Sequence, residues 1–334
     1  MQSTVSYVLV EHVENLELTG TAVINGTGND LRNTIRGNDA NNIINGGNAF
    51  DHLLGHGGDD VLIGGEDSHG DTLEGGRGDD RLEGGGGDDH LVGGAGEDFL
   101  DGGADFDTAS YEDAVSGVTV SLYSRLGTRG EAEGDTLISI ERILGSEFDD
   151  VLTADPDGSF LIGNGGMDEL YGQAGDDYLD GGEDADTLSG GAGADRLIGG
   201  ADFDTLTGGG DRDHFWFNSR EEMSSTTNPR LGYDVIKDFS GVNGGETDRI
   251  LLNFDLDETT SGWHNIFTFV GEQAVDYQSQ AVAEIWYYKD TTNSVTYLRG
   301  NTDADADFEF QLALVGTHDL VGNDIISIIP ISLL

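Results

Sequence analysis

A nine-residue unit, glycine-glycine-x-glycine-x-aspartate-x-leucine-x, recurs along this chain and restricts its fold more than any other feature. It is complete at residues 190–198, and the neighbouring units keep its phase. The sixth-position aspartates are Asp168, Asp177, Asp186, Asp195, Asp204 and Asp213, and the eighth-position apolar residues are Leu170, Leu179, Leu188, Leu197, Leu206 and Phe215. Two residue types held in phase over six units are typical of repeat proteins, whose units stack to build one continuous core.

An earlier block shows the same period less regularly. Its sixth-position aspartates are Asp51, Asp60, Asp71, Asp80, Asp89, Asp98 and Asp107. Two extra residues near Asp67 lengthen the step from Asp60 to Asp71, and we expect them to bulge from a turn, because a slip would move Leu73 off the core face. The units at 28–35 and 37–44 carry asparagine, which tolerates left-handed turns but brings no charge. We expect these units to be structural caps with little or no metal.

The sequence predicts an all-β chain of two parallel β-rolls, joined by a spacer and followed by a C-terminal β cap. Six turn residues and three strand residues form half a coil, so two units form a coil of eighteen residues, and coils stack at roughly 4.8 Å. The predicted boundaries are 1–36 for an N-terminal lead and cap, 37–110 for the first roll, 111–144 for the spacer, 145–216 for the second roll, and 217–334 for the cap and secretion region. Within the second roll, Ser159 stands at a sixth position, so that site is expected to be weak or empty.

The spacer and the cap read as strands outside the repeat. Alternation predicts strands at 118–122 and 136–140, with a loop at 128–134. In the cap, strands are expected at 283–288, 295–298 and 308–314, and the last alternates as a half-buried strand does. A roll needs such a cap because its last coil leaves an unpaired edge.

Charge limits what the chain can bind. The 334 residues carry a formal charge of −50, which repels nucleic acid and anionic membranes and favours disorder unless it is neutralised. There is no cysteine for a disulfide or a thiolate site, no apolar run long enough to span a bilayer, and no standard signal peptide at the start. Since 36% of residues are hydrophobic and regularly placed, we expect a chain that is unfolded without cations and folded with them.

The oxygen atoms of the stacked turns indicate which cation the chain would bind. Carboxylates about 5 Å apart repel by roughly 3 kcal/mol at an effective dielectric near 20, and a calcium ion between them reverses the sign. Calcium accepts six to eight oxygen ligands in irregular geometry, whereas magnesium needs a tighter octahedron and zinc prefers nitrogen and sulfur. With a dissociation constant of about 10⁻⁴ M, each site adds roughly 1.4 kcal/mol at millimolar calcium and almost nothing at cytosolic calcium. About eight sites would add on the order of 10 kcal/mol, which predicts a folding switch.

Other interpretations of the same residues are weaker. A flexible acidic linker would not keep apolar residues in phase, and the G-x-G-x-x-G matches lack the helix that dinucleotide binding requires. Asp303, Asp305 and Asp307 could form a further calcium loop, but alanine and Leu312 replace the glycine and glutamate of an EF-hand, which favours a solvated turn.

The repeats resemble the RTX (repeats-in-toxin) calcium-binding family. The resemblance implies a parallel β-roll whose sixth-position aspartates bind calcium with carbonyls of the glycine turns. Carried over, the ligands are Asp51, Asp60, Asp71, Asp80, Asp89, Asp98, Asp107, Asp150, Asp168, Asp177, Asp186, Asp195, Asp204 and Asp213, with carbonyls of Gly46, Gly55, Gly57, Gly75, Gly84, Gly86, Gly93, Gly172, Gly181, Gly190, Gly193 and Gly199.

The last third resembles the C-terminal domain of serralysin-type metalloproteases at residues 233–239, 267–271, 298–303, 307–310 and 322–326. This resemblance implies an uncleaved C-terminal signal, type I secretion and an extracellular location. The final residues, 327–334, are longer and more apolar than the family pattern leads us to expect.

No catalytic motif is found in the sequence. No histidine begins a His-Glu-x-x-His zinc motif, and no Gly-x-Ser-x-Gly elbow occurs. Three functions remain open: a calcium-binding secretion and folding module for an attached or lost enzyme, an accessory module for an extracellular polysaccharide like the R-modules of alginate epimerases, or a free-standing adhesin or matrix protein. Sugar contacts could come from Trp263, Trp286, Tyr287 and Tyr288, which more often fill a β core, and from Arg125, Arg129 and Arg142.

Overall fold

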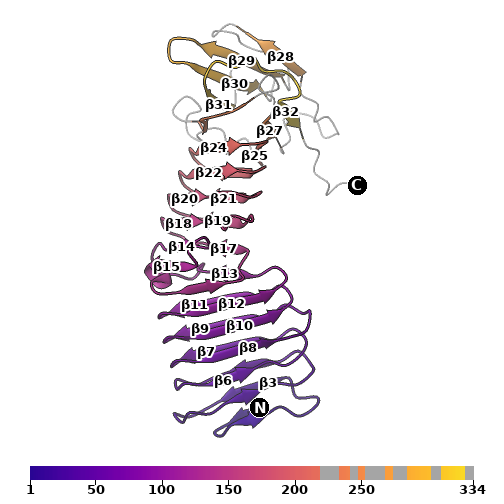
Figure 1. Cartoon of the computed structure of the whole chain (residues 1–334), viewed down its shortest axis with the longest axis vertical. Coiled ribbons are helices and arrows are strands. Elements are labelled where there is room, and N and C mark those ends of the chain that lie inside the picture. Colours follow the sequence, from indigo (N-terminus) through magenta and orange to yellow (C-terminus); the bar gives the residue numbers. More distant parts are fainter. Residues whose placement is uncertain (219–232, 241–246, 253–267, 274–283, 302–309, 328–334) are drawn as a thin grey trace. The chain divides into compact units, whose positions relative to one another are not determined.

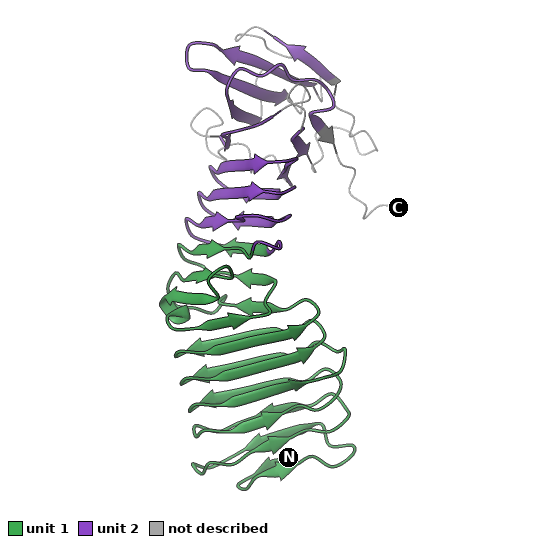
Figure 2. Cartoon of the chain, in the orientation of Figure 1, with its two compact units in different colours: residues 1–155, 160–164 green, residues 156–159, 165–334 purple. Residues whose placement is uncertain are grey.

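The computed structural model describes residues 1–218, 233–240, 247–252, 268–273, 284–301 and 310–327. Within these ranges the regular structure is β-strand, apart from one 3₁₀ helix, η1 (Gly130–Ala132) (Figure 1). The described residues include no helix with the length and hydropathy needed to cross a membrane. The chain divides into two compact units, coloured separately in Figure 2: unit 1 contains residues 1–155 and 160–164, and unit 2 contains residues 156–159 and 165–334.

Unit 1 consists of two sheets whose strands alternate along the chain, so that each coil contributes one strand to each sheet. The first sheet contains β1 (Gln2–Ser3), β3 (Asn15–Leu18), β5 (Thr34–Arg36), β7 (His52–Gly57), β9 (Thr72–Arg77), β11 (His90–Ala95), β13 (Thr108–Ser110), β17 (Arg142–Leu144) and β19 (Phe160–Asn164). The second contains β2 (Tyr7–Val8), β4 (Gly26–Thr27), β6 (Ile43–Asn45), β8 (Val61–Gly65), β10 (Arg81–Gly86), β12 (Phe99–Ala104), β16 (Thr136–Ile138), β15 (Leu126–Arg129), β14 (Thr119–Ser121) and β18 (Val151–Thr153).

The parallel register confirms the predicted coil. Leu82 pairs with Leu100, and Thr34 pairs with His52, each eighteen residues on. Across the predicted bulge the step becomes twenty residues, as between Leu53 and Leu73, and Leu73 stays fully buried. The eighth-position side chains from both sheets therefore fill one core, and the two extra residues at 66–69 are absorbed in a bend.

The segment between the arrays belongs to the same sheets and does not form a separate layer. β16 pairs in parallel with β12, and β17 pairs in parallel with β13. The remaining strands, β14 and β15, form an antiparallel hairpin, and β14 also pairs in parallel with β18. Because these strand pairings continue the sheets of the first array, unit 1 extends to residue 155. It therefore passes the boundaries predicted at residues 110 and 144.

Unit 2 repeats the two-sheet arrangement and then departs from it. One sheet contains β21 (Tyr178–Gly182), β23 (Arg196–Gly200), β25 (His214–Phe217), β27 (Arg249–Leu252) and β32 (Ile325–Ser327). The other contains β20 (Glu169–Tyr171), β22 (Thr187–Ala192), β24 (Thr205–Gly210), β26 (Val235–Ile236), β31 (Phe310–Val315), β30 (Val295–Asn301), β29 (Glu284–Asp290) and β28 (Thr268–Glu272). The strands predicted in the C-terminal region correspond to β29, β30 and β31.

The expectation of a half-buried last strand is wrong. In β31 the polar Gln311 is only 6% exposed, and its neighbours on both sides are buried. β31 lies between β26 and β30, so neither edge is free. Gln311 is accommodated because its side-chain oxygen accepts a hydrogen bond from Arg299 Nε at 2.7 Å.

Candidate calcium sites

The sixth-position aspartates line up in series that we call carboxylate ladders. In each ladder, Oδ1 of one aspartate accepts a hydrogen bond from the backbone N–H of the matching residue one coil earlier; the bond from Asp177 to Asp195, for example, is 2.9 Å long. Ladder 1 is Asp51, Asp71, Asp89 and Asp107; ladder 2 is Asp60, Asp80, Asp98 and Asp135; ladder 3 is Asp177, Asp195, Asp213 and Asp248; ladder 4 is Asp168, Asp186, Asp204 and Asp234. Ladders 1 and 2 lie in unit 1, and ladders 3 and 4 lie in unit 2.

The second carboxylate oxygen has a different environment. Oδ2 is buried without a hydrogen-bond donor in Asp51, Asp60, Asp80, Asp89, Asp98, Asp107, Asp186, Asp195 and Asp213. These aspartates are at most 4% exposed. A buried charged oxygen without a donor is strongly destabilising, so each of these atoms calls for a positively charged partner.

The glycine at the first position leaves room for that partner. A Cβ added to Gly190 would lie 2.2 Å from Asp195 Oδ2 and 2.6 Å from the carbonyl oxygen of Gly208. The same space recurs at Gly181, bounded by Asp186 Oδ2 and the Gly199 carbonyl, and at Gly75, bounded by Asp80 Oδ2 and the Gly93 carbonyl. Each space therefore brings a carboxylate oxygen and a backbone carbonyl together where no side chain stands, and this is an oxygen-rich setting that suits calcium.

The predicted carbonyl ligands fall into two groups. The carbonyls of Gly75, Gly84, Gly93, Gly190 and Gly199 face sixth-position aspartates, whereas those of Gly46 and Gly55 face Asn33 and Asn42. Gly102 and Gly208, which the sequence interpretation omitted, hold equivalent places beside Asp89 and Asp195. For Gly57, Gly86, Gly172, Gly181 and Gly193, a ligand role stays a prediction.

Electrostatics in the metal-free ladders oppose ionisation. Burial raises the pKa of Asp51 to about 7, of Asp89 to about 8 and of Asp186 to about 9, and neighbouring carboxylates of the same ladder add to the rise. Backbone N–H donors to Oδ1 lower these pKa values but do not offset burial. A bound divalent cation would hold these groups ionised.

In the asparagine units, hydrogen bonds from and to protein atoms satisfy the side chain at the sixth position. Asn42 Nδ2 donates to the carbonyl of Ile24 at 2.6 Å and to Asn38 Oδ1 at 3.1 Å. Asn33 Nδ2 donates to Asn29 Oδ1 at 3.3 Å. The amide therefore makes contacts that a carboxylate could not make, which supports our interpretation of these units as caps.

Asp150 differs from the other predicted ligands. Its Oδ2 accepts the Ser146 backbone N–H at 2.6 Å, and its Oδ1 accepts both the Ser146 hydroxyl and the Val118 N–H. Burial raises the pKa of Asp150, while these hydrogen bonds lower it. Both oxygens are thus bonded within the protein, in contrast to the open oxygens of Asp80 or Asp195.

Sequence reasoning missed three ladder members, Asp135, Asp234 and Asp248. All three are at most 3% exposed. They follow the preceding ladder aspartate by 37, 30 and 35 residues, so a search for a nine-residue step passes over them. The shared feature that could have found them is an aspartate two residues before a buried Leu or Ile, as in Asp234 and Ile236.

Each candidate site combines few side chains with backbone oxygens. Among the described residues, no three His, Cys, Asp or Glu side chains are grouped to hold a metal. A site built from successive ladder carboxylates and glycine carbonyls fits that observation, because carbonyls supply the remaining ligands. The residues that would hold calcium are therefore the open aspartates and the first-position glycines of the following coils.

Other predicted features lie elsewhere. Trp286, Tyr287 and Tyr288 are at most 9% exposed and belong to the core of the C-terminal sheet, so they do not form a sugar-stacking surface. Trp263, Asp303, Asp305 and Asp307 lie outside the described residues.

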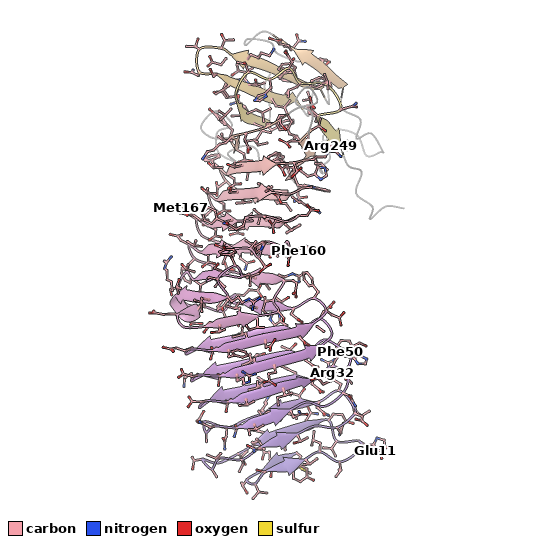
Figure 3. The ribbon with its side chains drawn as sticks, in the orientation of Figure 1. Glu11, Arg32, Phe50, Phe160, Met167 and Arg249 are labelled. Atoms are coloured by element: carbon pink, nitrogen blue, oxygen red, sulfur yellow. The ribbon has the colours of Figure 1, made fainter. Side chains whose placement is uncertain are left out.

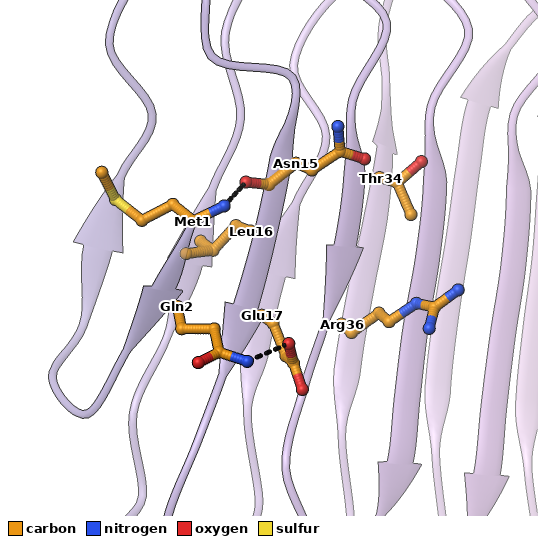
Figure 4. Close-up of a pocket in the computed structure, with 7 residues that line it drawn as sticks. All are labelled: Met1, Gln2, Asn15, Leu16, Glu17, Thr34 and Arg36. Atoms are coloured by element: carbon orange, nitrogen blue, oxygen red, sulfur yellow. Dashed lines mark hydrogen bonds between the residues drawn. The ribbon is translucent and has the colours of Figure 1, made fainter.

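A hollow of about 320 Å³ over the first strands of unit 1 is lined by Met1, Gln2, Asn15, Leu16, Glu17, Thr34 and Arg36 (Figure 4). No ladder carboxylate lines this hollow, so it is separate from the candidate calcium sites.

Comparison with protein families identifies the repeats. A family model described as an RTX calcium-binding nonapeptide repeat (4 copies) matches residues 36–68, 67–100, 74–109, 162–197 and 189–219. The matches fall in both arrays and extend no further than residue 219, so the resemblance of the C-terminal region to serralysin-type C-terminal domains stays a prediction. A search of curated proteins finds no match to this chain.

The solved structures similar to this chain include two subunits of an epimerase and a lipase. The AlgE6R2 subunit of the mannuronan C5-epimerase from Azotobacter vinelandii is 24% identical, with 56% of this chain and 92% of that chain covered and a TM-score of 0.35. The AlgE6R3 subunit of that enzyme is 28% identical over 55% of this chain and 80% of that chain, with a TM-score of 0.31. The extracellular lipase LipA from Serratia marcescens is 15% identical over 88% of this chain and 40% of that chain, with a TM-score of 0.20.

Proposed function

We propose that this protein, an RTX calcium-binding protein whose repeats bind several Ca²⁺ ions, is a folding module for secretion. The chain leaves the cell unfolded through a type I apparatus and folds when extracellular calcium fills its ladders. In doing so it stabilises an enzyme to which it is or was attached. The matched repeat is a calcium-binding module rather than a catalytic one, and we assign no reaction to this chain.

One observation carries the proposal: in the part of the chain that the structure describes, the nine ladder aspartates named above each bury an Oδ2 atom without a donor. In the absence of metal, successive carboxylates in a ladder repel one another by roughly 3 kcal/mol per pair at an effective dielectric near 20. Calcium supplies the missing positive charge and links one coil to the next. Folding and metal binding are then a single equilibrium, since unfolded turns do not hold the carbonyls in place.

Cellular calcium sets the direction of that equilibrium. At millimolar free calcium, a site with a dissociation constant of about 10⁻⁴ M stabilises the fold by roughly 1.4 kcal/mol. At sub-micromolar calcium the same site contributes almost nothing. With a formal charge of −50 and no metal, the chain stays extended, which is the state that export through a narrow channel requires.

The test is a titration of the full chain with free calcium. We expect little β-sheet circular dichroism and a large hydrodynamic radius in EGTA, and a cooperative gain of β signal with compaction at sub-millimolar to millimolar calcium. Magnesium at the same concentrations should fail to replace calcium. A native β spectrum in EGTA that calcium does not change would contradict the proposal.

Export is tested separately in cells that express a type I apparatus. We expect the full chain to reach the medium and a chain ending at residue 216 to remain inside, because the resemblance places the signal in residues 217–334. Equal release of both chains would remove the secretion part of the proposal and leave calcium-driven folding untouched.

A second candidate function is binding of an anionic polysaccharide at the β14–β15 hairpin. Tyr123 is 66% exposed at the turn of this hairpin, and Leu126 is 45% exposed. Residues 114–130 contain Arg125 and Arg129 and no acidic residue, in a chain that is strongly acidic elsewhere. An exposed ring beside a guanidinium can stack on a sugar and bind its carboxylate. Glycan-array binding that disappears in both Tyr123→Ala and Arg125→Ala would support this function, and binding unchanged in both would exclude it.

A further inference from the structure

The segment between the two repeat arrays, residues 111–154, is built differently from the arrays, and we call it the inter-array block. In the arrays, ladder aspartates such as Asp80, Asp98 and Asp195 bury one oxygen without a donor. In the block, Tyr111 donates its hydroxyl to Asp135 Oδ2 at 2.9 Å, and both residues are buried. Asp135 Oδ1 accepts the Asp98 N–H at 2.9 Å, so both oxygens of this carboxylate are satisfied by protein atoms.

Ser146 donates hydrogen bonds to the carboxylate of Asp150. Its backbone N–H donates to Oδ2 at 2.6 Å and its hydroxyl donates to Oδ1 at 2.9 Å. Ser146 is fully buried, so water does not compete for these bonds. Gly145 leaves the same space beside Asp150 as the array glycines do, so the block differs from the arrays here in supplying hydrogen-bond donors to both carboxylate oxygens.

The block also buries more apolar side chains than a repeat unit does. Val118, Val120 and Leu122 are buried in one run around β14, where a repeat unit buries a single eighth-position residue. Leu137, Ile143 and Leu152 continue the core from β16, β17 and β18. This burial contributes to folding whether or not metal is present.

The acidic side chains of the block lie outside its central segment: residues 111–154 contain nine carboxylates and three arginines. Residues 114–130 contain two arginines and no carboxylate. Arg142 stacks its guanidinium 4.7 Å from the ring centre of Phe106 and 5.8 Å from that of Phe160, which is labelled in Figure 3. The two rings also pack edge to face at 5.1 Å. Since β13, β17 and β19 are neighbours in the sheet, this contact joins the turn before β13 to β17 and β19 without metal.

We infer that the inter-array block is a calcium-independent folding block, in which Tyr111 and Ser146 take the place of metal at Asp135 and Asp150. The block gives the first array a folded edge on which its calcium-dependent coils assemble. Ladder 2 ends at Asp135 because Tyr111 closes it, and the Asn33 and Asn42 units close the opposite end of the array. This inference rests on the proposed calcium-driven folding of the arrays.

Hydrogen exchange of the full chain in EGTA and in millimolar calcium tests the inference. In the block, the amides of Leu122, Leu137 and Val151 donate to backbone carbonyls of the block itself. In the array, the amides of Arg81 and His90 do the same. In EGTA we expect the block amides to exchange more than about tenfold more slowly than the array amides, and in calcium we expect both sets to be protected.

The outcomes separate the two proposals. If block and array amides both exchange freely in EGTA and gain protection in calcium, the inference is overturned and calcium-driven folding stands. If both sets are protected in EGTA, calcium-driven folding itself is wrong. Slow exchange confined to the block supports both.

Calcium counting gives an independent readout. Asp135→Asn and Asp150→Asn should bind as many calcium ions per chain as the unaltered protein, measured by native mass spectrometry, whereas Asp80→Asn should bind fewer. Loss of a calcium ion in Asp135→Asn would overturn the inference. Tyr111→Phe, which keeps the ring and removes the donor, should speed exchange of the Leu137 amide about tenfold in EGTA, and unchanged exchange would show that the hydroxyl does not close the ladder.

Discussion

Replacing Asp195 by asparagine should give a loss of stability that grows with calcium concentration. Asp195 stands between Asp177 and Asp213 in ladder 3, so its carboxylate borders two gaps between coils. Asparagine keeps the side-chain oxygen that accepts the Asp177 N–H and removes the negative charge from the position of Oδ2. The substitution therefore tests the charge and leaves the backbone hydrogen bond in place.

The size of the effect follows from the two gaps. With a dissociation constant of about 10⁻⁴ M, two sites contribute about 2.8 kcal/mol at millimolar calcium, and this contribution grows by about 2.7 kcal/mol for each further tenfold rise in calcium. At a urea m-value near 2 kcal/mol/M, the loss at millimolar calcium should lower the unfolding midpoint by about 1.4 M. An ordinary packing defect would give a loss independent of calcium.

Urea unfolding followed by circular dichroism at several free calcium concentrations measures this slope. Asp202→Asn is the matched control, because Asp202 is exposed, its φ of 74° suits asparagine, and the change in net charge is identical. We expect the control to change the free energy of unfolding by no more than about 0.5 kcal/mol at every calcium concentration. A loss of stability in Asp195→Asn that stays constant as calcium rises would falsify the assignment of Asp195 as a calcium ligand.

Three further predictions test the glycine space, the protonation of the ladders and the cap. Gly190→Ala should lower the free energy of unfolding by about 1–3 kcal/mol and raise the calcium midpoint of folding, because its Cβ would meet Asp195 Oδ2 at 2.2 Å. Gly210→Ala is the control: its Cβ would meet only the Gly191 carbonyl oxygen at 3.9 Å, so it should be nearly neutral in the same urea and calcium titrations. In EGTA, the β-sheet circular dichroism signal should increase as pH falls from 8 towards 5. A carboxyl whose folded pKa is raised, such as Asp89 at about 8, contributes stability that is full below its unfolded pKa of 3.8 and is lost as pH rises through its folded pKa. A signal that does not change with pH would contradict this prediction. At millimolar calcium, where the array is folded, Asn42→Asp should cost about 1–3 kcal/mol by removing the donors to Ile24 and Asn38, visible as faster amide exchange at Val61, whereas Asn41→Asp at the exposed neighbouring position should leave that exchange unchanged.

The periodic part of the fold could be predicted from the sequence because the eighth-position apolar residue of each unit is buried only if it faces the core. Leu82 and Leu100 are eighteen residues apart and pair in register, and both are fully buried. Even the two-residue insertion near Asp67 was predictable, since a register slip would have exposed Leu73. Local period and core packing favour the same arrangement here, which is why sequence reasoning succeeds.

The aperiodic part required the structure. The step from Asp98 to Asp135 spans 37 residues, and no local pattern shows that a hairpin leaves the sheet and returns to the same ladder. In the same way, Gln311 is buried because Arg299 lies opposite it on the neighbouring strand, and that strand pairing is not encoded within β31 itself. Long-range pairing thus decides both features, and a single-sequence pattern does not report it.

The difference between open and closed carboxylates lies in the atoms that face Oδ2. At Asp195 the facing residue is Gly190, which has no side chain, and the oxygen has no donor. At Asp135 it is a tyrosine hydroxyl, and at Asp150 a serine N–H. The aspartate alone therefore does not define a calcium site, because the same residue at an equivalent ladder position can be satisfied by the protein. The first-position glycine does not define a site alone either, because Gly145 leaves the same space beside Asp150, whose Oδ2 already accepts the Ser146 N–H. A calcium site therefore needs both that space and an aspartate oxygen without a donor, and counting aspartates alone overestimates the number of bound ions.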